Sequence, residues 1–415
     1  MIVFLTSLAV VGCAKAPTPT VPAAPTAPTA PVTKPTAPTA PAKVYRLKYH
    51  ESRTASSVYV RNFVEPWSRL IERESGGRVK IDIYLSETLL RTRDALDGIL
   101  AGIADMGSTS GQTYPGRFPL HEATLMPFLF ETTLVAGLSI WDAYEQGYFK
   151  NEYKDVKILY FASNGPAQIV SRTKYIKTLE DWKGLRVQAG VGSIAVEVTK
   201  LLGAVYLGIT SPEMYEAMQR GLQDVSVREW EGQNAWRVYE VAKYRTGGVG
   251  LVCSSATQVQ IMNLTSYNNL PPDIRAIIDK NTGKWSSEHI NANMDREDKW
   301  RFQQILEYDK QVGNPPVYFL PAEERNRWRE VLKPVEDTYI KQLEPKGLAS
   351  AGTETLNKLK EFSKKYAAMY PPGSDAEYEM WKKHGYESLY PGLPKDFVMP
   401  CLLYTSPSPR DRTRS

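Results

Sequence analysis

Apolar residues change between strand spacing and helix spacing from about residue 44 onward, and this alternation limits the possible folds most strongly. Residues 45–49 alternate apolar and basic side chains, as a strand with one buried face does, and residues 60–74 carry apolar side chains at helical intervals. A second alternating segment follows at 79–84, a second helical segment at 92–104 and a short third strand at 104–107. Strands that alternate with helices predict an α/β fold with parallel strands.

The same alternation returns after Val156, around Val187 and again near Val225. From Asn293 onward the pattern is almost wholly helical and ends in a stretch rich in proline, glycine and tyrosine at 370–400. The 415 residues therefore predict α/β structure in more than one part of the chain, followed by a helical C-terminal part.

Composition is that of a globular protein, with 42% hydrophobic and 23% charged residues. The formal net charge is +5, and three arginines against one aspartate among the last fifteen residues account for two of these charges. A charge this small gives no indication of nucleic-acid binding. No apolar run reaches the roughly 18 residues that a membrane-spanning helix needs.

Motifs of catalysis and metal binding are missing. The three cysteines, Cys13, Cys253 and Cys401, stand far apart, and the four histidines show no close ligand spacing, so no metal, cofactor or disulfide framework is predicted. Residues 107–111 read GSTSG, with Thr109 where a nucleophile elbow has serine. These observations favour a protein that is not an enzyme and leave a secreted α/β hydrolase as the weaker alternative.

The N-terminal residues 1–13 form a short apolar stretch that ends in VVGC, which resembles a bacterial lipobox. We expect a lipoprotein signal peptide that ends at Cys13, with this cysteine carrying the lipid. A buried N-terminal strand is the alternative interpretation. Residues 14–43 consist almost entirely of alanine, proline, threonine and valine, which predicts an extended tether between a membrane surface and a folded body.

The last residues, 401–415, fit nothing before them. They read CLLYTSPSPRDRTRS, without periodicity, and resemble translated sequencing-adapter DNA. A natural basic tail is the alternative. We exclude the segment from functional interpretation.

Several blocks in fixed order resemble the DctP-type solute receptors of tripartite ATP-independent periplasmic (TRAP) transporters. The blocks are GRVKIDIY at 77–84, ALDGILAGIADM at 95–106, YPGRFPL at 114–120, MPFL at 126–129, LEDWKGLRV at 179–187, EMYEAMQRG at 213–221 and YEVAKY at 239–244. The resemblance covers at least residues 44–280.

This resemblance implies a bilobal periplasmic-binding-protein-like fold with a ligand cleft and crossing hinge segments. We expect a solute-binding domain at 44–400, with lobe I at about 44–164 plus 250–292, lobe II at about 165–249 plus 293–345, and a helical C-terminal extension at 346–400. The expected partners are a small-molecule solute and the small and large membrane subunits of a TRAP transporter. The expected location is extracytoplasmic, with a lipid anchor. A lipoprotein receptor of an ATP-driven importer is the alternative with the same fold.

The strand after the block KG carries a departure from the family. Where the family has an arginine that grips a ligand carboxylate, this chain has Gln188, and Arg186 stands at the family lysine position. Gln188 suits a hydroxyl or an amide better than a carboxylate. Arg186 faces the same side of the strand, so it either leans into the cleft or lies on a solvated rim. The solute is therefore an organic acid held by another cation, or a neutral polar or aromatic compound.

Further candidate ligand-binding residues follow the ends of other strands, where ligand sites of α/β sheets collect. Trp230 can stack on a ring or pack in the core, and Arg228 or Glu231 can hydrogen-bond the solute. The other lobe and the lobe crossing contribute the remaining candidates, which are His50, Glu51, Ser52, Ser108, Thr109, Ser110 and Asn164.

Overall fold

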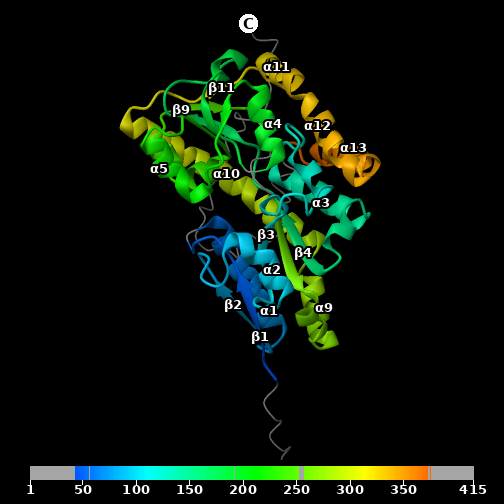
Figure 1. Ribbon diagram of the computed structural model, residues 1–415. Coiled ribbons are helices and arrows are strands. Elements are labelled where there is room, and N and C mark those ends of the chain that lie inside the picture. The colour runs from blue at the N-terminus through cyan, green and yellow to red at the C-terminus, as the bar shows by residue number, and fades with distance from the viewer. Residues whose placement is uncertain (1–42, 56, 191, 252–256, 373, 375–415) are drawn as a thin grey trace, which may run out of the picture. The chain divides into compact units, whose positions relative to one another are not determined.

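The computed structural model describes residues 43–55, 57–190, 192–251, 257–372 and 374, and the strands in this part of the chain form two sheets (Figure 1). The first sheet has the order β2-β1-β3-β10-β4, and the second has the order β11-β9-β5-β8-β6-β7. Helices surround both sheets. The bilobal α/β fold predicted from the alternation and from the family resemblance is confirmed.

The first sheet brings the C-terminal ends of four strands to one edge. β1 is parallel to β2 and β3, and β10 is antiparallel to both β3 and β4, so β4 runs in the same direction as β1. The strands of this sheet are β1 (Tyr45–His50), β2 (Val79–Tyr84), β3 (Met106–Ser110), β4 (Val156–Ala162) and β10 (Gln258–Asn263).

The second sheet repeats this arrangement. β6 is parallel to β7 and β8, and β5 is antiparallel to β8 and β9, so β8 and β9 run in the same direction. Its strands are β5 (Gln168–Ser171), β6 (Arg186–Gln188), β7 (Val205–Tyr206), β8 (Val225–Arg228), β9 (Tyr244–Gly247) and β11 (Tyr318–Phe319). Because β5 begins where β8 ends, Gln168 pairs with Arg228 at the edge that the chain reaches from the first lobe.

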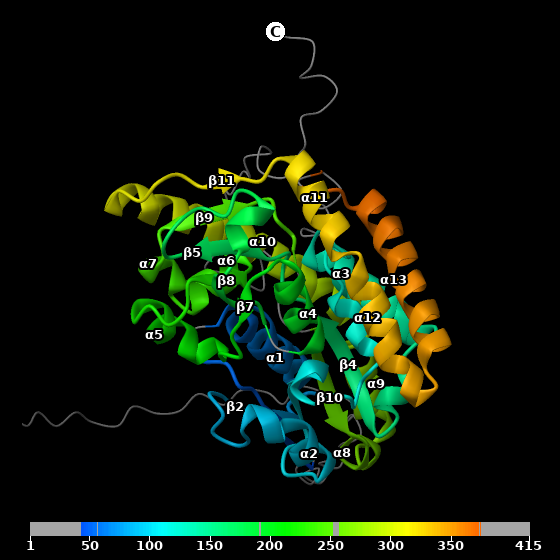
Figure 2. The ribbon, with the colours of Figure 1, turned by 45° about the horizontal axis from the view of Figure 1, so that its top comes forward.

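Helices of the described chain divide between the lobes, and two C-terminal helices lie along both (Figure 2). The first lobe has α1 (Glu65–Glu74), α2 (Ala95–Leu100), α3 (Thr133–Glu145), α8 (Leu264–Asn268) and α9 (Pro272–Lys280). The second has α4 (Ser193–Leu201), α5 (Met214–Gln219), α6 (Trp230–Ala235), α7 (Val238–Val241) and α11 (Ala322–Leu332). α12 (Pro334–Leu343) contacts α4, and α13 (Ala349–Met369) packs on α3.

Two expected helices differ in detail from the prediction. The helix expected at 92–104 ends earlier, because α2 stops at Leu100 and Gly102 follows in a left-handed conformation with φ +74°. The helix expected at 60–74 begins with a π-helical turn at Val60–Val64 before α1. Pro66 lies just after this turn, and its missing N–H removes a helical hydrogen bond at the point where the regular α-helical pattern is already interrupted.

The long helix α10 (Lys284–Val312) contacts α3 and β4 of the first lobe and α6 of the second (Figure 1). Toward the first lobe, Asp295 accepts hydrogen bonds from the N–H groups of Thr133 and Leu134 at 2.6 and 2.9 Å, at the start of α3. Glu297 accepts one from the amide Nδ2 of Asn62 at 3.0 Å. These carboxylates satisfy donors that the first lobe would otherwise bury unpaired.

Toward the second lobe, α10 uses two further acids. Asp298 accepts a hydrogen bond from the N–H of Glu231 at 2.8 Å, in the first turn of α6. Asp309 forms an ion pair of 2.7 Å with Arg245 of β9, whose side chain is fully buried. Burial raises the pKa of all four α10 acids. The proposed lobe boundary between residues 292 and 293 thus falls inside one continuous helix.

Several segments of interest lie outside the described residues. They are the signal peptide and Cys13, the tether up to residue 42, Cys253, and residues 375–415, which include Cys401 and the segment 401–415. Within the described ranges, no helix combines the length and the apolar character needed to cross a membrane.

The buried Arg245–Asp309 pair gives a stability prediction. Asp309→Ala leaves Arg245 buried without its counter-charge and should lower the free energy of unfolding by about 3–5 kcal/mol. Asp273→Ala breaks a surface pair with Arg78 and should cost about 1 kcal/mol or less. Urea unfolding followed by tryptophan fluorescence measures both changes, and equal losses in the two variants would contradict the assignment.

Candidate functional site

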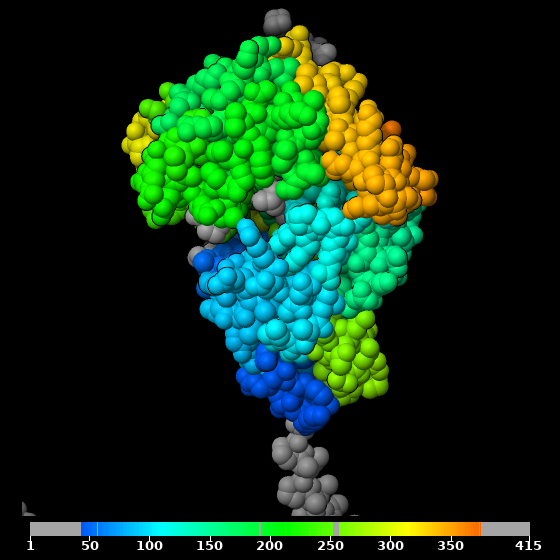
Figure 3. Space-filling model, viewed as in Figure 1, coloured from blue at the N-terminus to red at the C-terminus, as the bar shows by residue number. Residues whose placement is uncertain are grey.

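The strand ends of the two sheets meet where the chain crosses between the lobes. Gly165, in the segment between β4 and β5, lies beside Glu229, which follows β8, and beside Asp298 of α10. In the space-filling view, a hollow separates the green surface of the second lobe from the blue and cyan surface of the first lobe (Figure 3). The polar side chains at these strand ends are therefore the candidates for a ligand site.

On the first lobe, His50 ends β1 and is fully buried. Neither ring nitrogen of His50 has a hydrogen-bond partner in the described part of the chain. Burial lowers the pKa of His50, so the ring is neutral at pH 7 and offers one donor and one acceptor. Gly107 makes this placement of His50 possible, since a Cβ at residue 107 would stand 2.6 Å from the carbonyl oxygen of His50.

Glu51 is also fully buried and follows His50 directly. Its Oε1 accepts hydrogen bonds from the N–H and the guanidinium of Arg53 at 3.1 and 3.0 Å, while Oε2 has no partner among the described residues. The Arg53 guanidinium also lies 4.4 Å from the centre of the Tyr59 ring and 3.4 Å from the hydroxyl of Ser108. Glu51 therefore presents one occupied and one open carboxylate oxygen.

The polar side chains at the end of β3 are of two kinds, those with hydrogen-bond partners inside the lobe and those without a partner among the described residues. The Ser108 hydroxyl accepts from the amide of Gln260 at 3.1 Å, and the Thr109 hydroxyl donates to Tyr114 at 3.1 Å. Ser110 Oγ and Gln112 Oε1 are buried and have no hydrogen-bond partner in the described chain. Sequence reasoning missed Gln112, and its place two residues after the strand was the only signal that could have indicated it.

On the second lobe, Arg228 ends β8 with only 4% of its surface exposed. Its guanidinium donates to the hydroxyl of Ser211 at 2.9 Å. Burial lowers the pKa of Arg228, whereas the negative charges of Glu229 and Glu231 oppose that effect. A cation this deeply buried at a strand end is suited to receive a ligand anion.

Glu231 links the charges of the two lobes. Burial raises its pKa to about 7, and Glu229 adds to that effect, while the positive charges of Arg53 and Arg301 oppose it. Arg53 belongs to the first lobe and Glu231 to the second, so these two side chains interact electrostatically between the lobes.

Gln188 and Arg186 are both engaged within the second lobe. Gln188 is buried, its Oε1 accepts from the Ser226 hydroxyl at 3.2 Å, and its Nε2 lies 3.4 Å from the carbonyl oxygen of Ile209. Arg186 forms a two-pronged ion pair with Asp224, at 2.9 Å from Nε and 2.7 Å from a terminal nitrogen. The Arg186 guanidinium is therefore already occupied by a carboxylate.

Two other sequence candidates lie nearby. Trp230 is 1% exposed, and its ring packs 4.6 Å from that of Phe302 on α10, so most of its surface is used in the core. Asn164 follows Ser163 in the segment that joins the two sheets and is partly exposed.

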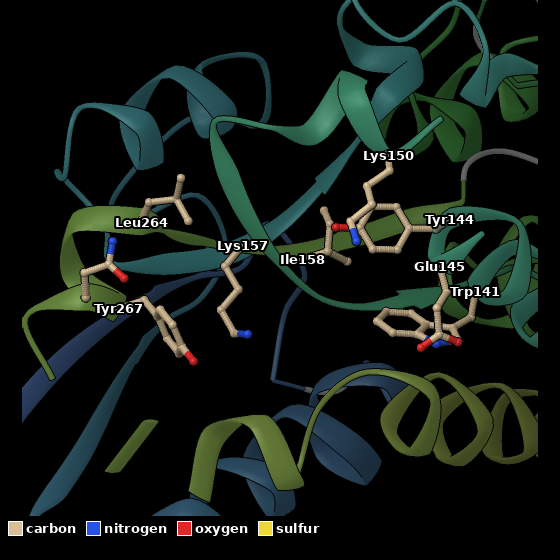
Figure 4. A pocket seen from close by; sticks show the side chains of 9 residues that line it. Trp141, Tyr144, Glu145, Lys150, Lys157, Ile158, Leu264 and Tyr267 are labelled. Atoms are coloured by element: carbon tan, nitrogen blue, oxygen red, sulfur yellow. The ribbon is translucent and has the colours of Figure 1, made fainter. Parts of the chain in front are cut away.

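A separate hollow of about 370 Å³ lies on the first lobe, between α3, β4 and α8 (Figure 4). Trp141 and Tyr144 lie at one end of it and Tyr267 at the other, with Lys157 between them. The Lys157 amine pairs with Asp279 at 2.7 Å and covers the Tyr267 ring at 4.4 Å. The positive charge of Lys157 is thus paired with a carboxylate of the same lobe. In the residues that the structure describes, no three histidine, cysteine or acidic side chains are grouped as metal ligands would be.

The raised pKa of Glu231 gives a prediction for pH dependence. The folded state holds the Glu231 proton up to about pH 7, whereas the unfolded state releases it near the ordinary value of 4.5, so stability falls as pH rises between these values. Glu231→Gln should remove up to about 3 kcal/mol of this decline. Urea unfolding from pH 4.5 to 8 measures it, with Glu354→Gln on the exposed face of α13 as the control. Parallel curves for wild type and Glu231→Gln would contradict the prediction.

The sequence of the chain is similar to those of known proteins. The family model of the bacterial extracellular solute-binding proteins, family 7 (DctP), matches residues 50–342. The C4-dicarboxylate-binding periplasmic protein DctP of Rhodobacter capsulatus is 24% identical over 295 residues, which are 70% of this chain and 85% of the relative.

Solved structures resemble the chain over most of its length. A TRAP solute-binding protein of Rhodoferax ferrireducens T118, in complex with copurified benzoate, aligns with a TM-score of 0.72 and 26% identity over 78% of this chain and 99% of that one. A marine metagenome TRAP solute-binding protein specific for aromatic acid ligands, co-crystallised with 3-hydroxybenzoate, has a TM-score of 0.72 and 24% identity over the same shares.

The family match spans both lobes and the segments that cross between them. The proteins of this family are extracytoplasmic receptors that capture a small solute and deliver it to the membrane subunits of a TRAP transporter. The chain belongs to the bacterial extracellular solute-binding protein family 7, the DctP family of TRAP solute receptors.

Proposed function

We propose that this receptor binds a hydroxylated organic acid between its lobes and releases it chemically unchanged. The observation that carries the proposal is the set of buried polar atoms without hydrogen-bond partners at the end of the first sheet, which are both ring nitrogens of His50, Glu51 Oε2, Ser110 Oγ and Gln112 Oε1. An unsatisfied buried polar group costs about 1–3 kcal/mol, so a ligand that supplies the missing partners binds favourably.

The types of these atoms indicate the chemistry of the ligand. Glu51 Oε2 and Gln112 Oε1 only accept hydrogen bonds, so they require ligand donors such as hydroxyl groups. On the opposite lobe, Arg228 supplies a buried cation, which a carboxylate neutralises. A solute with a hydroxyl at one end and a carboxylate at the other satisfies both lobes.

The loss of the family arginine at Gln188 is compatible with an acid ligand. The amide oxygen of Gln188 already accepts a hydrogen bond from Ser226, and the guanidinium of Arg186 already forms an ion pair with Asp224. Arg228 is therefore the cation that we assign to the carboxylate, which then approaches the second lobe from a different strand than in the rest of the family. We assign Trp230 and Asn164 to the border of the site. We assign Ser108 and Thr109 to hydrogen bonds within the first lobe that hold the end of β3 in place.

The relatives support an acid. Benzoate was copurified with the Rhodoferax ferrireducens protein, and the marine metagenome protein carries 3-hydroxybenzoate. The alternatives of a receptor for an ATP-driven importer and of a secreted hydrolase gain no support from these comparisons.

Binding measurements with matched probes test the proposal. Wild type should bind 3-hydroxybenzoate more tightly than 3-hydroxybenzamide by calorimetry, and Arg228→Gln should weaken acid binding at least about tenfold, because a charge-assisted hydrogen bond contributes roughly 1.5–3 kcal/mol. Arg186→Gln is the matched control on β6 and should stay within about threefold, since Asp224 already occupies that guanidinium.

Two results would contradict this assignment. One is a strong preference for the acid that survives Arg228→Gln, and the other is an equal loss in Arg186→Gln. Chromatography of the recovered solute tests the absence of turnover, and conversion of more than one equivalent per protein would show an enzyme.

We further propose that residues 1–13 are a lipoprotein signal and that Cys13 anchors the receptor to a membrane through the tether at 14–43. Cys13→Ser should move the protein from the membrane fraction to the soluble fraction of the producing cells. Ala14→Ser serves as the control, and unchanged membrane association of Cys13→Ser would refute the anchor.

A further inference from the structure

Two arginines of α11 cover one aromatic ring at the junction of the lobes. Arg325 and Arg329 lie one helical turn apart, with their guanidinium carbons 5.9 and 5.1 Å from the centre of the Phe128 ring. Phe128 belongs to the first lobe, in the segment before α3, whereas α11 packs on the second lobe through Trp328 against Trp182. The two arginines therefore lie at a contact between the lobes, on elements other than the strand ends that form the site between the lobes.

Neither guanidinium forms an ion pair with a residue that the structure describes. Across the described residues, Arg325 and Arg329 have no ion pair and no hydrogen bond, and the Nε atom of each is buried without a partner. Arg327 on the same helix behaves differently, because it pairs with Glu324 at 2.6 Å and with Glu180 at 2.9 Å. Within the described ranges, Arg327 is thus the arginine of this group that forms ion pairs, whereas Arg325 and Arg329 form none.

The backbone near Arg325 and Arg329 approaches the Arg325 guanidinium closely at Gly250 and is strained at Phe128. A Cβ at Gly250 would stand 3.1 Å from a terminal nitrogen of Arg325, and Gly250 has φ +59°. Phe128 has φ 60°, a left-handed conformation that costs a residue of this size free energy and that persists only where packing imposes it. Packing therefore fixes Phe128 in this conformation, with its ring close to the two guanidinium groups.

The charges at this point favour a ligand with more than one negative charge. Burial lowers the pKa of Arg325 and the neighbouring Arg329 lowers it further, while Glu131 is the carboxylate that opposes them without forming an ion pair. The guanidinium groups of Arg325 and Arg329 donate no hydrogen bond to a described residue, so their terminal N–H groups remain available to a ligand. Such paired planar donors match the oxygens of a phosphate group.

We propose that Arg325 and Arg329 form a second ligand site that binds a phosphate-type oxyanion at the lobe junction. This site is independent of the acid site proposed above. The phosphate group is either free inorganic phosphate or the headgroup of an anionic lipid.

Calorimetric titration of the full chain with inorganic phosphate tests the site. We expect saturable binding and a rise in melting temperature, and the double variant Arg325→Gln/Arg329→Gln should bind phosphate at least about tenfold more weakly and lose the rise. Arg327→Gln removes one positive charge from the same helix, as each single variant does, and should bind phosphate as wild type does. The single variants Arg325→Gln and Arg329→Gln provide the measurement if the double variant does not fold.

Two further experiments identify the source of the phosphate group and separate this proposal from that of the acid site. Binding to phosphatidylglycerol vesicles but not to phosphatidylcholine vesicles, lost in the double variant, would assign the site to a lipid headgroup, and binding of inorganic phosphate alone would assign it to a soluble ion. Arg228→Gln should leave phosphate binding unchanged, so a failure of the acid site does not affect this test. Absence of phosphate binding in wild type, or equal binding in wild type and the arginine variants, would overturn the proposal.

Discussion

Four buried carboxyl groups along α10 hold the two lobes to one helix. Asp295 and Glu297 bind donors of the first lobe, and Asp298 and Asp309 bind donors of the second, so the helix passes from one lobe to the other between residues 297 and 298. Burying these acids costs desolvation energy, which their hydrogen bonds offset. Each bond is made to a particular backbone or side-chain donor, so each fixes where α10 lies against its lobe.

This attachment decides where the protein can bend. A change in the angle between the lobes has to act on α10 near Asp298 or on the segments that join the sheets. The described crossing residues include Gly165, and also Gly248 and Gly250, which have positive φ angles that other residues adopt only with strain. The hydrogen bond from Glu231 to Asp298 places the start of α6, and with it Arg228 and Glu231, next to the same point. The candidate site and the segments that join the lobes are thus built from the same few residues.

Charged side chains around the candidate site form a series of alternating sign that extends over both lobes. Glu51 and Arg53 on the first lobe are followed by Glu231 and Arg228 on the second, and neighbouring members of this series influence one another's pKa.

Arg186 illustrates why residue type alone does not identify a binding cation. Its sequence position resembles that of a ligand contact, but Asp224 lies close enough to accept both prongs of its guanidinium. The Arg228 guanidinium donates to the Ser211 hydroxyl at 2.9 Å, and Arg228 is more deeply buried than Arg186.

Local patterns in the chain predicted the strands and most helices. Alternating residues produced β1 and β2 where expected, because the period of a strand depends only on which face is buried. The same reasoning missed the early end of α2, where the conformation of Gly102 decides. It indicated His50, Glu51 and Arg228 as candidates because ligand groups of parallel sheets follow strand ends, a rule that needs only the order of elements. These side chains are buried at strand ends, and their role in binding stays a prediction.

The sequence by itself determined the α/β class, the family and the strand ends at which polar side chains collect, since short-range periodicity and ordered blocks carry that information. Only the tertiary structure decided which of those side chains are already engaged. Gln188, Arg186 and Trp230 meet Ser226, Asp224 and Phe302, partners that are 38 to 72 positions away in the chain. The pairing of Arg325 and Arg329 with Phe128 is still more distant and left no local pattern. Contacts between distant residues depend on how the lobes fold and pack, and this is why the free or occupied state of a polar group could not be predicted from the chain alone.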